Sequence, residues 1–265
     1  MTEQPRSDEL RTAAEALRAA HHASHPLVLP NAWDVASARA VEAAGFPVVA
    51  TSSHAVADVL GTRDDDSGDP DLVFPYLARI AAGVGVPVTA DVEAGYRLPP
   101  ADLVGRLLGA GIVGCNLEDT DHHGPDVLVD ADRQADRLAA VRAAAVDAGV
   151  PLVVNARVDT FIRRVGEPAE QLAEGIRRAR RYLEAGADCV YPIGLADRDA
   201  IREFITAVDG PVNFLVRSDG PALAELAELG ARRISFGGGL HRQVIDALRE
   251  RLAGIAAGSP GVRRP

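Results

Sequence analysis

The chain has 265 residues, with 28 basic and 38 acidic side chains and a formal net charge of −10 at pH 7. All the basic residues are arginine, which excludes Schiff-base catalysis by lysine and a P-loop lysine on a nucleotide phosphate. Negative charge with few aromatic residues also argues against a nucleic-acid partner, because such a surface needs basic patches and stacking platforms.

The sequence predicts a soluble protein without a membrane partner. Charged residues run through residues 1–17, so no secretory signal is expected, and the longest uncharged stretch, residues 43–57, is too short to span a membrane. Cys115 and Cys189 stand alone in apolar runs, which favours two core residues over a disulfide. We therefore expect a cytoplasmic protein.

Helices and strands are expected to alternate along the chain. A helix near residues 8–21 comes first. The chain then repeats one junction, in which a helical stretch ends at glycine and a short run rich in Val and Ile begins one or two residues later. The expected strands are residues 27–30, 48–51, 87–93, 112–118, 151–158, 188–193, 211–216 and 232–236.

Eight buried strands that alternate with helices predict an α/β fold, a (βα)₈ TIM barrel, whereas a doubly wound sheet usually has fewer strands. No linker divides the chain, so a single domain is expected over residues 1–265. Within it, residues 1–24 would form the N-terminal helix, 25–254 the barrel and 255–265 a flexible tail.

Polar residues gather where three consecutive predicted strands end. By the period of two, Asp91 shares a face with Glu93, Asn116 with Glu118, and Asn155 with Arg157 and Asp159. Catalytic groups of such barrels lie at the carboxyl ends of the strands. The sequence therefore predicts a charged site at this end of the barrel.

Three of these acids, with Asp64 in the loop after the second strand, predict a metal site. If Asp91, Glu93 and Glu118 lay about 5 Å apart, each like-charge pair would cost roughly 3 kcal/mol, so the cluster must be protonated or hold a cation. Oxygen ligands without His or Cys suit Mg²⁺ or Mn²⁺ rather than Zn²⁺. The alternative is that the acids cap helices or pair with nearby arginines (Arg97, Arg157).

Four segments carry a family resemblance: residues 60–64 (LGTRD), 91–96 (DVEAGY), 117–119 (LED) and 156–159 (ARVD). With them, the chain from about Pro30 to Gly239 resembles the isocitrate lyase and phosphoenolpyruvate mutase superfamily. That superfamily includes methylisocitrate lyase, oxaloacetate hydrolase and phosphonopyruvate hydrolase.

The resemblance implies roles for the charged residues. Asp91 would bind Mg²⁺ directly, and Asp64, Glu93 and Glu118 would hold it directly or through water. Arg157 matches the family arginine that holds a substrate carboxylate, and a guanidinium fork suits that planar anion.

The family also places a loop of small residues after the second strand, where this chain has Ser52 and Ser53. The Ser52 hydroxyl and the amides of both residues would bind the carboxylate or enolate oxygens of a 2-oxo acid. Further candidates for substrate binding are Tyr96, Asn155, Arg217 and Asn31, although Tyr96 could equally pack on its loop and Asn31 could serve a turn before the first barrel helix.

The segment after Glu118 departs from the family. The C–C lyases carry a K-K-C-G-H loop whose cysteine is the general acid, and mutases carry a lysine after the Glu-Asp pair. This chain has Thr120 at the lysine position and no such cysteine. The sequence also departs from the family at Pro192 and near Leu215. The residues that select the reaction are therefore not identified, and the neighbouring residues Asn213, Arg217 and Ser218 could take their place.

Proton transfer then needs another group, and His122 or His123 could supply it. Imidazole titrates near neutral pH, and the Gly-Pro that follows would let the loop act as a lid. The alternative is a pair of solvated loop histidines. His54 is a third candidate, and the other histidines are expected at the surface (His21, His22, His25, His241).

Together these features predict a Mg²⁺-dependent lyase that cleaves a C–C bond in a small 2-hydroxy or 2-oxo di- or tricarboxylic acid through an enolate. Its catalytic residues would be Arg157, Glu118, His122 and His123. The alternatives are a phosphonopyruvate or oxaloacetate hydrolase, a phosphoenolpyruvate mutase-type enzyme, and a non-catalytic protein that binds a 2-oxo acid. The resemblance also implies a homo-oligomer, for which a helix from about Leu240 to Leu252 is available.

Overall fold

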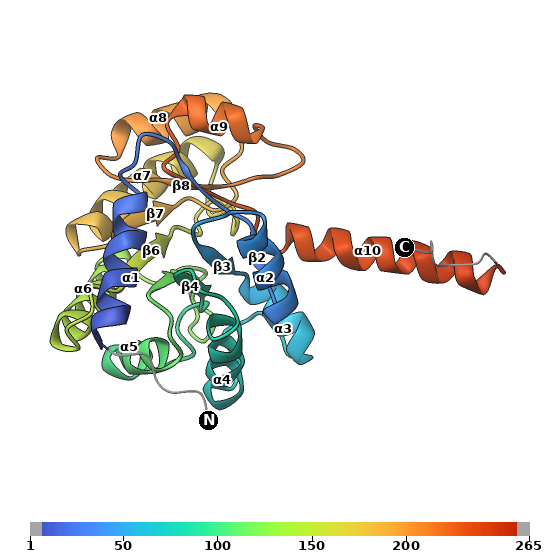
Figure 1. The fold of residues 1–265 in the computed structure, drawn as a ribbon. Coiled ribbons are helices and arrows are strands. Elements are labelled where there is room, and N and C mark those ends of the chain that lie inside the picture. Colours follow the sequence, from blue (N-terminus) through green and yellow to red (C-terminus); the bar gives the residue numbers. More distant parts are fainter. Residues whose placement is uncertain (1–6, 259–265) are drawn as a thin grey trace.

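The structure is a computed structural model that describes residues 7–258. Parallel strands form its centre and helices cover them on the outside (Figure 1). The strands are β1 (Leu27–Leu29), β2 (Asn31–Ala32), β3 (Val49–Thr51), β4 (Val88–Asp91), β5 (Gly114–Leu117), β6 (Val153–Arg157), β7 (Cys189–Tyr191), β8 (Asn213–Leu215) and β9 (Arg233–Ser235). The helices are α1 (Ser7–Ala20), α2 (Val35–Ala43), α3 (Ser53–Leu60), α4 (Pro70–Ala81), α5 (Pro100–Gly109), α6 (Ala131–Asp147), α7 (Pro168–Glu184), α8 (Arg198–Ala207), α9 (Leu223–Leu229) and α10 (Gly239–Ala256).

The strands close into the barrel that the sequence predicts. β2 to β7 pair in chain order, and β1 pairs with β9, which pairs with β8. β1 and β2 are one apolar run divided at Pro30, which has no N–H to donate. A parallel bridge between Val190 and Val212 joins β7 to the segment before β8, so the ring is complete. The TIM-barrel expectation is confirmed.

The register of β4, β5 and β6 sets the level of the site. Asp91 pairs with Asn116, and Asn116 pairs with Asn155. The predicted third strand is too long, however, because β4 ends at Asp91 and Glu93 takes the left-handed conformation with φ 52°. Strand alternation therefore does not place Glu93 beside Asp91, as expected from the period of two. The backbone turns there instead.

α1, which corresponds to the helix expected near residues 8–21, closes the amino-terminal end of the barrel. Its Leu10, Ala14 and Leu17 are buried in a cluster with residues from the starts of the strands, among them Leu27 and Val153. Such burial of apolar area contributes about 25 cal/mol per Å². The opposite end, where the carboxyl ends of the strands lie, is left for the site.

α10 runs away from the barrel (Figure 1). It continues to Ala256, so the predicted tail from residue 255 begins inside a helix, and the rest of that tail, residues 259–265, lies outside the described residues. Its Val244, Leu248 and Leu252 recur every four residues and are 53%, 50% and 54% exposed. One apolar stripe of this helix is therefore uncovered in the single chain.

Three further expectations can be compared with the fold. Cys115 and Cys189 are free and buried, as predicted. The expectation that His21 and His241 lie at the surface is wrong, because both are buried. The His241 ring packs edge-on against Trp33, with ring centroids 5.0 Å apart. In the described part of the chain, no helix has the length and apolar character needed to cross a membrane.

Candidate active site

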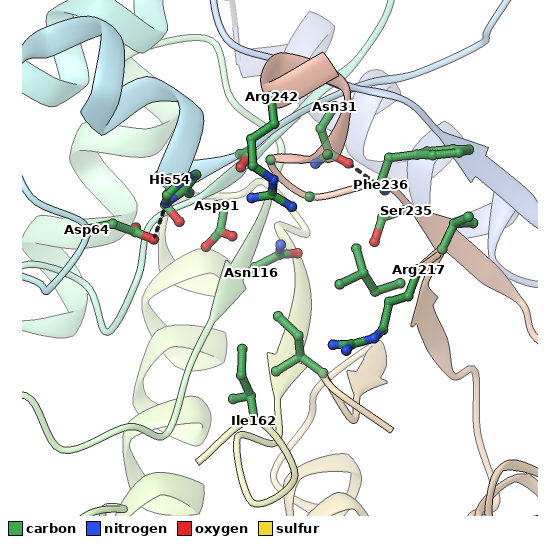
Figure 2. Close-up of a pocket in the computed structure, with 18 of the residues that line it drawn as sticks. Asn31, His54, Asp64, Asp91, Asn116, Ile162, Arg217, Ser235, Phe236 and Arg242 are labelled. Carbon is green, nitrogen blue, oxygen red and sulfur yellow. Dashed lines mark hydrogen bonds and ion pairs between the residues drawn. The ribbon is translucent and has the colours of Figure 1, made fainter. Parts of the chain in front are cut away.

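A cavity of about 630 Å³ opens at the carboxyl ends of the strands (Figure 2). The residues named for the site in the sequence analysis that line it are Asn31, Ser52, Ser53, His54, Asp64, Asp91, Asn116, Arg157, Arg217 and Ser218. Those that do not line it are Glu93, Tyr96, Glu118, His122, His123 and Asn155. Residues far apart in the chain thus meet in one hollow, at the end of the barrel where the sequence places the site.

Asp91 lies at the base of the cavity beside Asn116. The Asn116 amide has a fixed orientation, because its Oδ1 accepts from Asn155 Nδ2 at 2.8 Å and from Arg233 Nη2 at 3.0 Å. Its Nδ2 is left to donate to the Asp91 carboxylate. Burial raises the pKa of Asp91, and Arg157 and this hydrogen bond offset only part of the rise.

Glu93 lies in the tight turn that follows β4. Its carboxylate accepts the backbone N–H of Asp66, and burial raises its pKa to about 8. Asp66 in turn accepts from the Tyr96 backbone N–H at 2.7 Å and contacts His123 Nε2 at 3.0 Å. Asp66 was not predicted; it links the loop between α3 and α4 to the loops after β4 and β5.

Arg157 and Glu118 form the charged centre of the site. Arg157 donates from Nε and Nη2 to Asp159 at 3.0 and 2.7 Å, and its Nη1 lies 2.5 Å from Glu118 Oε2 and 3.8 Å from Asp91 Oδ2. Burial still raises the pKa of Glu118 to about 7. One guanidinium therefore serves three carboxylates, which is too little positive charge for all of them.

The segment after β5 is held from behind by a second buried network. Asp119 is fully buried and accepts from Arg178 Nη1 at 2.9 Å and from the Tyr182 hydroxyl at 2.6 Å. Thr120, at the position where the resemblance predicts a lysine, donates to Asp159 at 2.6 Å. The threonine thus supports the partner of Arg157 and does not reach the cavity, since it is not among the residues that line it.

His122 and His123 point at acids and, in the described chain, neither lines the cavity. His122 Nε2 lies 2.5 Å from Glu118 Oε1, and this hydrogen bond raises the pKa of the imidazole. The loop that carries them is closed on itself by a bridge between Thr120 and Leu128. The expected proton donors therefore lie behind the acids in this conformation.

Ser52 and Ser53 lie where β3 passes into α3. The Ser52 amide donates to Ala32 O at 3.3 Å, and the Ser52 hydroxyl accepts from Ala55 N at 3.5 Å as the N-cap of α3. The expectation that the Ser52 amide binds a ligand needs correction, because this N–H is used within the fold, whereas the Ser52 hydroxyl only accepts there and keeps its O–H to donate. The first amides of α3, Ser53 and His54, have no hydrogen-bond partner within residues 7–258, so they are the donors available to an anion.

Tyr96 and Asn155 do not line the cavity, so they are corrected as substrate-binding residues. Tyr96 is buried with its ring edge-on to Phe74, at a centroid distance of 6.0 Å. Asn155 is one level deeper in the barrel, where it holds Asn116. Asn31 links strands, donating to Thr51 O and accepting from Phe236 N, each at 2.8 Å.

Sequence reasoning missed the part of the wall that β7, β9 and α10 supply. These residues are Tyr191, Ser235, Phe236, residues 237–239 and Arg242. The three glycines between a predicted strand and a predicted helix were an available signal, because the loop after the last strand of such barrels is a common anion site.

The donor set can be tested for a divalent cation. Within the described residues, no three His, Cys, Asp or Glu side chains converge closely enough to hold a metal together. This does not support direct coordination by all four predicted acids. It fits one direct carboxylate, Asp91, with the other acids reached through water, which is the arrangement that Mg²⁺ favours. The raised pKa values of Asp91, Glu93 and Glu118 also mark a site short of positive charge.

A TIM barrel with buried carboxylates and an arginine below an open polar cavity belongs to the class of barrel enzymes that act on small anions. The family model for phosphoenolpyruvate phosphomutase matches residues 17–256. The chain belongs to this family, within the phosphoenolpyruvate mutase and isocitrate lyase superfamily, whose members are lyases and mutases that use divalent metal ions and act on small carboxylates.

Three similar proteins illustrate this membership. An uncharacterised protein of Mycobacterium tuberculosis (strain CDC 1551) is 38% identical over 82% of this chain and 80% of its own length. A Corynebacterium glutamicum protein with a provisional assignment as 2-methylisocitrate lyase is 30% identical over 82% of this chain and 68% of its own. The crystal structure of a provisional phosphonomutase from Burkholderia cenocepacia J2315 superposes with a TM-score of 0.85 at 38% identity, covering 91% of this chain and 99% of that one.

Proposed function

We propose that this chain is a Mg²⁺-dependent C–C lyase that cleaves a small 2-hydroxy or 2-oxo di- or tricarboxylate to give an enolate-derived product. The observation that carries the proposal is the floor of the cavity, where Asp91, Asn116 and Arg157 meet beneath the first turn of α3. A 2-oxo acid placed there would meet cationic and N–H donors on one side and carboxylates suited to a cation on the other.

In this proposal each residue has a separate task. Asp91 would hold the Mg²⁺ or Mn²⁺ directly, while Asp64, Glu93 and Glu118 would hold its water ligands. A divalent cation bound there supplies electrostatic stabilisation of the developing enolate oxygen. The Ser53 and His54 amides at the start of α3 and the Arg157 guanidinium orient the substrate carboxylate.

His54 is the histidine best placed to move a proton. It lines the cavity, whereas His122 and His123 do not. Its Nδ1 lies 3.7 Å from Asp64 Oδ2. This contact, drawn as a dashed line in Figure 2, leaves Nε2 for a ligand. His122 remains a second candidate, because a lid movement that separates it from Glu118 would bring the imidazole toward the cavity.

The test is a Mg²⁺-dependent activity screen on oxaloacetate, methylisocitrate, dimethylmalate and phosphonopyruvate, with Asp91→Ala as the control. We expect two carbonyl or carboxylate fragments from one of the first three, and none from the variant. Free phosphate or a rearranged P–C bond would assign a hydrolase or mutase. Tight oxalate binding without turnover on the whole panel would assign a binding protein.

We further propose a cytoplasmic homo-oligomer in which the stripe Val244, Leu248 and Leu252 of α10 packs against a second copy. These side chains are too exposed to be explained by packing within the chain. Sedimentation velocity should show a dimer or tetramer that Leu248→Glu dissociates. Val146→Glu, which changes a 66% exposed valine on α6, should leave the assembly intact, and a monomeric wild type would contradict the proposal.

A further inference from the structure

An arginine crosses the interior of the barrel beneath the cavity. Arg233 lies on β9, whose neighbours in the sheet are β1 and β8, yet its Nη2 donates to Asn116 Oδ1 on β5 at 3.0 Å. The side chain therefore spans the barrel from one wall to another. Arg233 is 1% exposed and does not line the cavity, so it can act on a ligand there only through another residue.

The stability of the fold does not explain this arginine. Within residues 7–258, Arg233 forms no ion pair, and its Nε and Nη1 have no hydrogen-bond partner. The buried Arg178, in contrast, is paired with Asp119 at 2.9 Å. Burial lowers the pKa of Arg233, and a buried charge without a partner costs free energy of folding. The bond to Asn116 is therefore the best reason for its position.

This bond decides the orientation of a pair of amides. Asn155 Nδ2 donates to Asn116 Oδ1 at 2.8 Å. If both amides turned over, Asn155 would accept and Asn116 would donate, so the pair by itself has two possible orientations. A guanidinium can only donate, so the Asn116 atom that faces Arg233 must be Oδ1. Asn116 Nδ2 is then directed to the Asp91 carboxylate.

We infer that Arg233 is a positioning residue, which acts through Asn116 to hold Asp91 in the orientation that binds a divalent cation. The inference rests on the proposed function, because it takes Asp91 as the direct ligand of the cation. Asp91 and Asn116 lie next to each other at the cavity floor (Figure 2). Groups that hold a metal ligand from behind change metal affinity by about 10- to 100-fold.

The experiment measures Mn²⁺ affinity and thermal stability separately. Mn²⁺ binding to the full chain is followed by electron paramagnetic resonance, and we expect Arg233→Met to bind at least about tenfold more weakly. Arg233→Lys, which can still only donate, should keep part of the affinity. In EDTA the melting temperature of Arg233→Met should not fall, because the variant removes an unpaired buried charge. A purely structural role predicts the opposite, a lower melting temperature with unchanged Mn²⁺ affinity.

A double-mutant cycle tests the route through Asn116. Asn116→Ala should weaken Mn²⁺ binding, and Arg233→Met should cause no further loss in that variant, because the arginine acts only through the amide. Arg232→Met is the matched control. Arg232 is the exposed neighbour on the chain, donates to Ala23 O and does not line the cavity, so this variant should keep the wild-type Mn²⁺ affinity.

The possible failures separate the inference from the proposed function. If the wild type binds Mn²⁺ and Asp91→Ala does not, the metal site stands. The role of Arg233 is then wrong if Arg233→Met binds Mn²⁺ like the wild type, melts at a lower temperature in EDTA, or weakens binding by the same factor with and without Asn116. If the wild type does not bind Mn²⁺, or if Asp91→Ala binds it equally well, the proposed function fails and the inference with it.

Discussion

The two ends of the barrel treat buried polar groups in opposite ways. At the carboxyl end, Asp91, Glu118 and Asp159 surround Arg157 at an open cavity of about 630 Å³. At the amino end, α1 seals the strands with apolar side chains, and the buried imidazole of His21 donates from Nδ1 to Leu17 O at 2.8 Å. One end gathers carboxylates at an open cavity, and the other is closed by apolar packing around His21 and the buried Arg233.

This difference separates chemistry from stability. Carboxylates with raised pKa values gain nothing for the fold by being charged, so their placement is explained by what they bind. Apolar packing and a neutral histidine gain nothing for catalysis, so their placement is explained by folding. Substitutions at the two ends should therefore change different measurements.

The largest expected effect is at the carboxyl end. Asp91→Asn should lower kcat by at least about 10³-fold, because it removes the one direct ligand proposed for the cation. The melting temperature of the metal-free protein should not fall, since burial already raises the pKa of Asp91 and disfavours its charge. Activity assays and calorimetry in EDTA check both. Activity within tenfold of the wild type would refute the metal site.

Arg178→Met tests whether charge at the carboxyl end can serve stability alone. Arg178 and Asp119 are 8% and 0% exposed, and the variant leaves Asp119 buried without its cation. Breaking a buried pair in this way costs about 3–5 kcal/mol of unfolding free energy, measured by urea denaturation. Arg181→Met on the same helix removes an exposed pair with Asp132 and should cost at most about 1 kcal/mol. Equal losses in the two variants would contradict the buried network.

His21 provides the corresponding test at the amino end. Burial, with Arg233 nearby, lowers its pKa from 6.5 to about 4. The folded protein therefore resists a proton that the unfolded chain accepts, so stability is full above pH 6.5 and is lost as the pH falls toward 4. The loss from this group should be about 3 kcal/mol, and His21→Gln should remove it from the stability profile. His22→Gln, which changes an exposed neighbour, should show the same dependence of stability on pH as the wild type. If His21→Gln also showed the wild-type dependence, the His21 imidazole would not be excluded from protonation.

The sequence predicts the framework of both ends because that framework is local. Helices that end at glycine followed by apolar runs fixed the strands, and each strand end then placed Asp91 and Arg157. The position of Glu93 was not predicted correctly, because Glu93 itself takes the left-handed backbone conformation and ends the alternation of the strand. The part of the cavity wall that contains Arg242 forms only when the barrel closes and β9 pairs with β1. These two strands are separated by most of the chain, so no local sequence pattern predicts the contact.

Side-chain direction on loops was the other limit. The two histidines after Glu118 have the spacing and chemistry of proton donors, yet hydrogen bonds to Glu118 and Asp66 turn them to the far side of the acids. His54 precedes them in the chain by two helices and two strands, and it lines the cavity because α3 starts directly at the end of β3. Secondary-structure propensity and residue spacing do not show whether a histidine side chain lines the cavity or turns away from it.

The smallest expected effect decides which histidine moves the proton. His54→Gln keeps the size of the side chain but removes its basic nitrogen, so kcat should fall by about 10²-fold. The double variant His122→Gln with His123→Gln should lower kcat by less than about tenfold, because those rings support acids and do not meet the substrate in this conformation. KM should change little in the His54 variant, since Arg157 and the α3 amides still bind the carboxylate. The reverse order, with the double variant inactive and His54→Gln unimpaired, would assign the proton to the lid and require the loop after β5 to open during turnover.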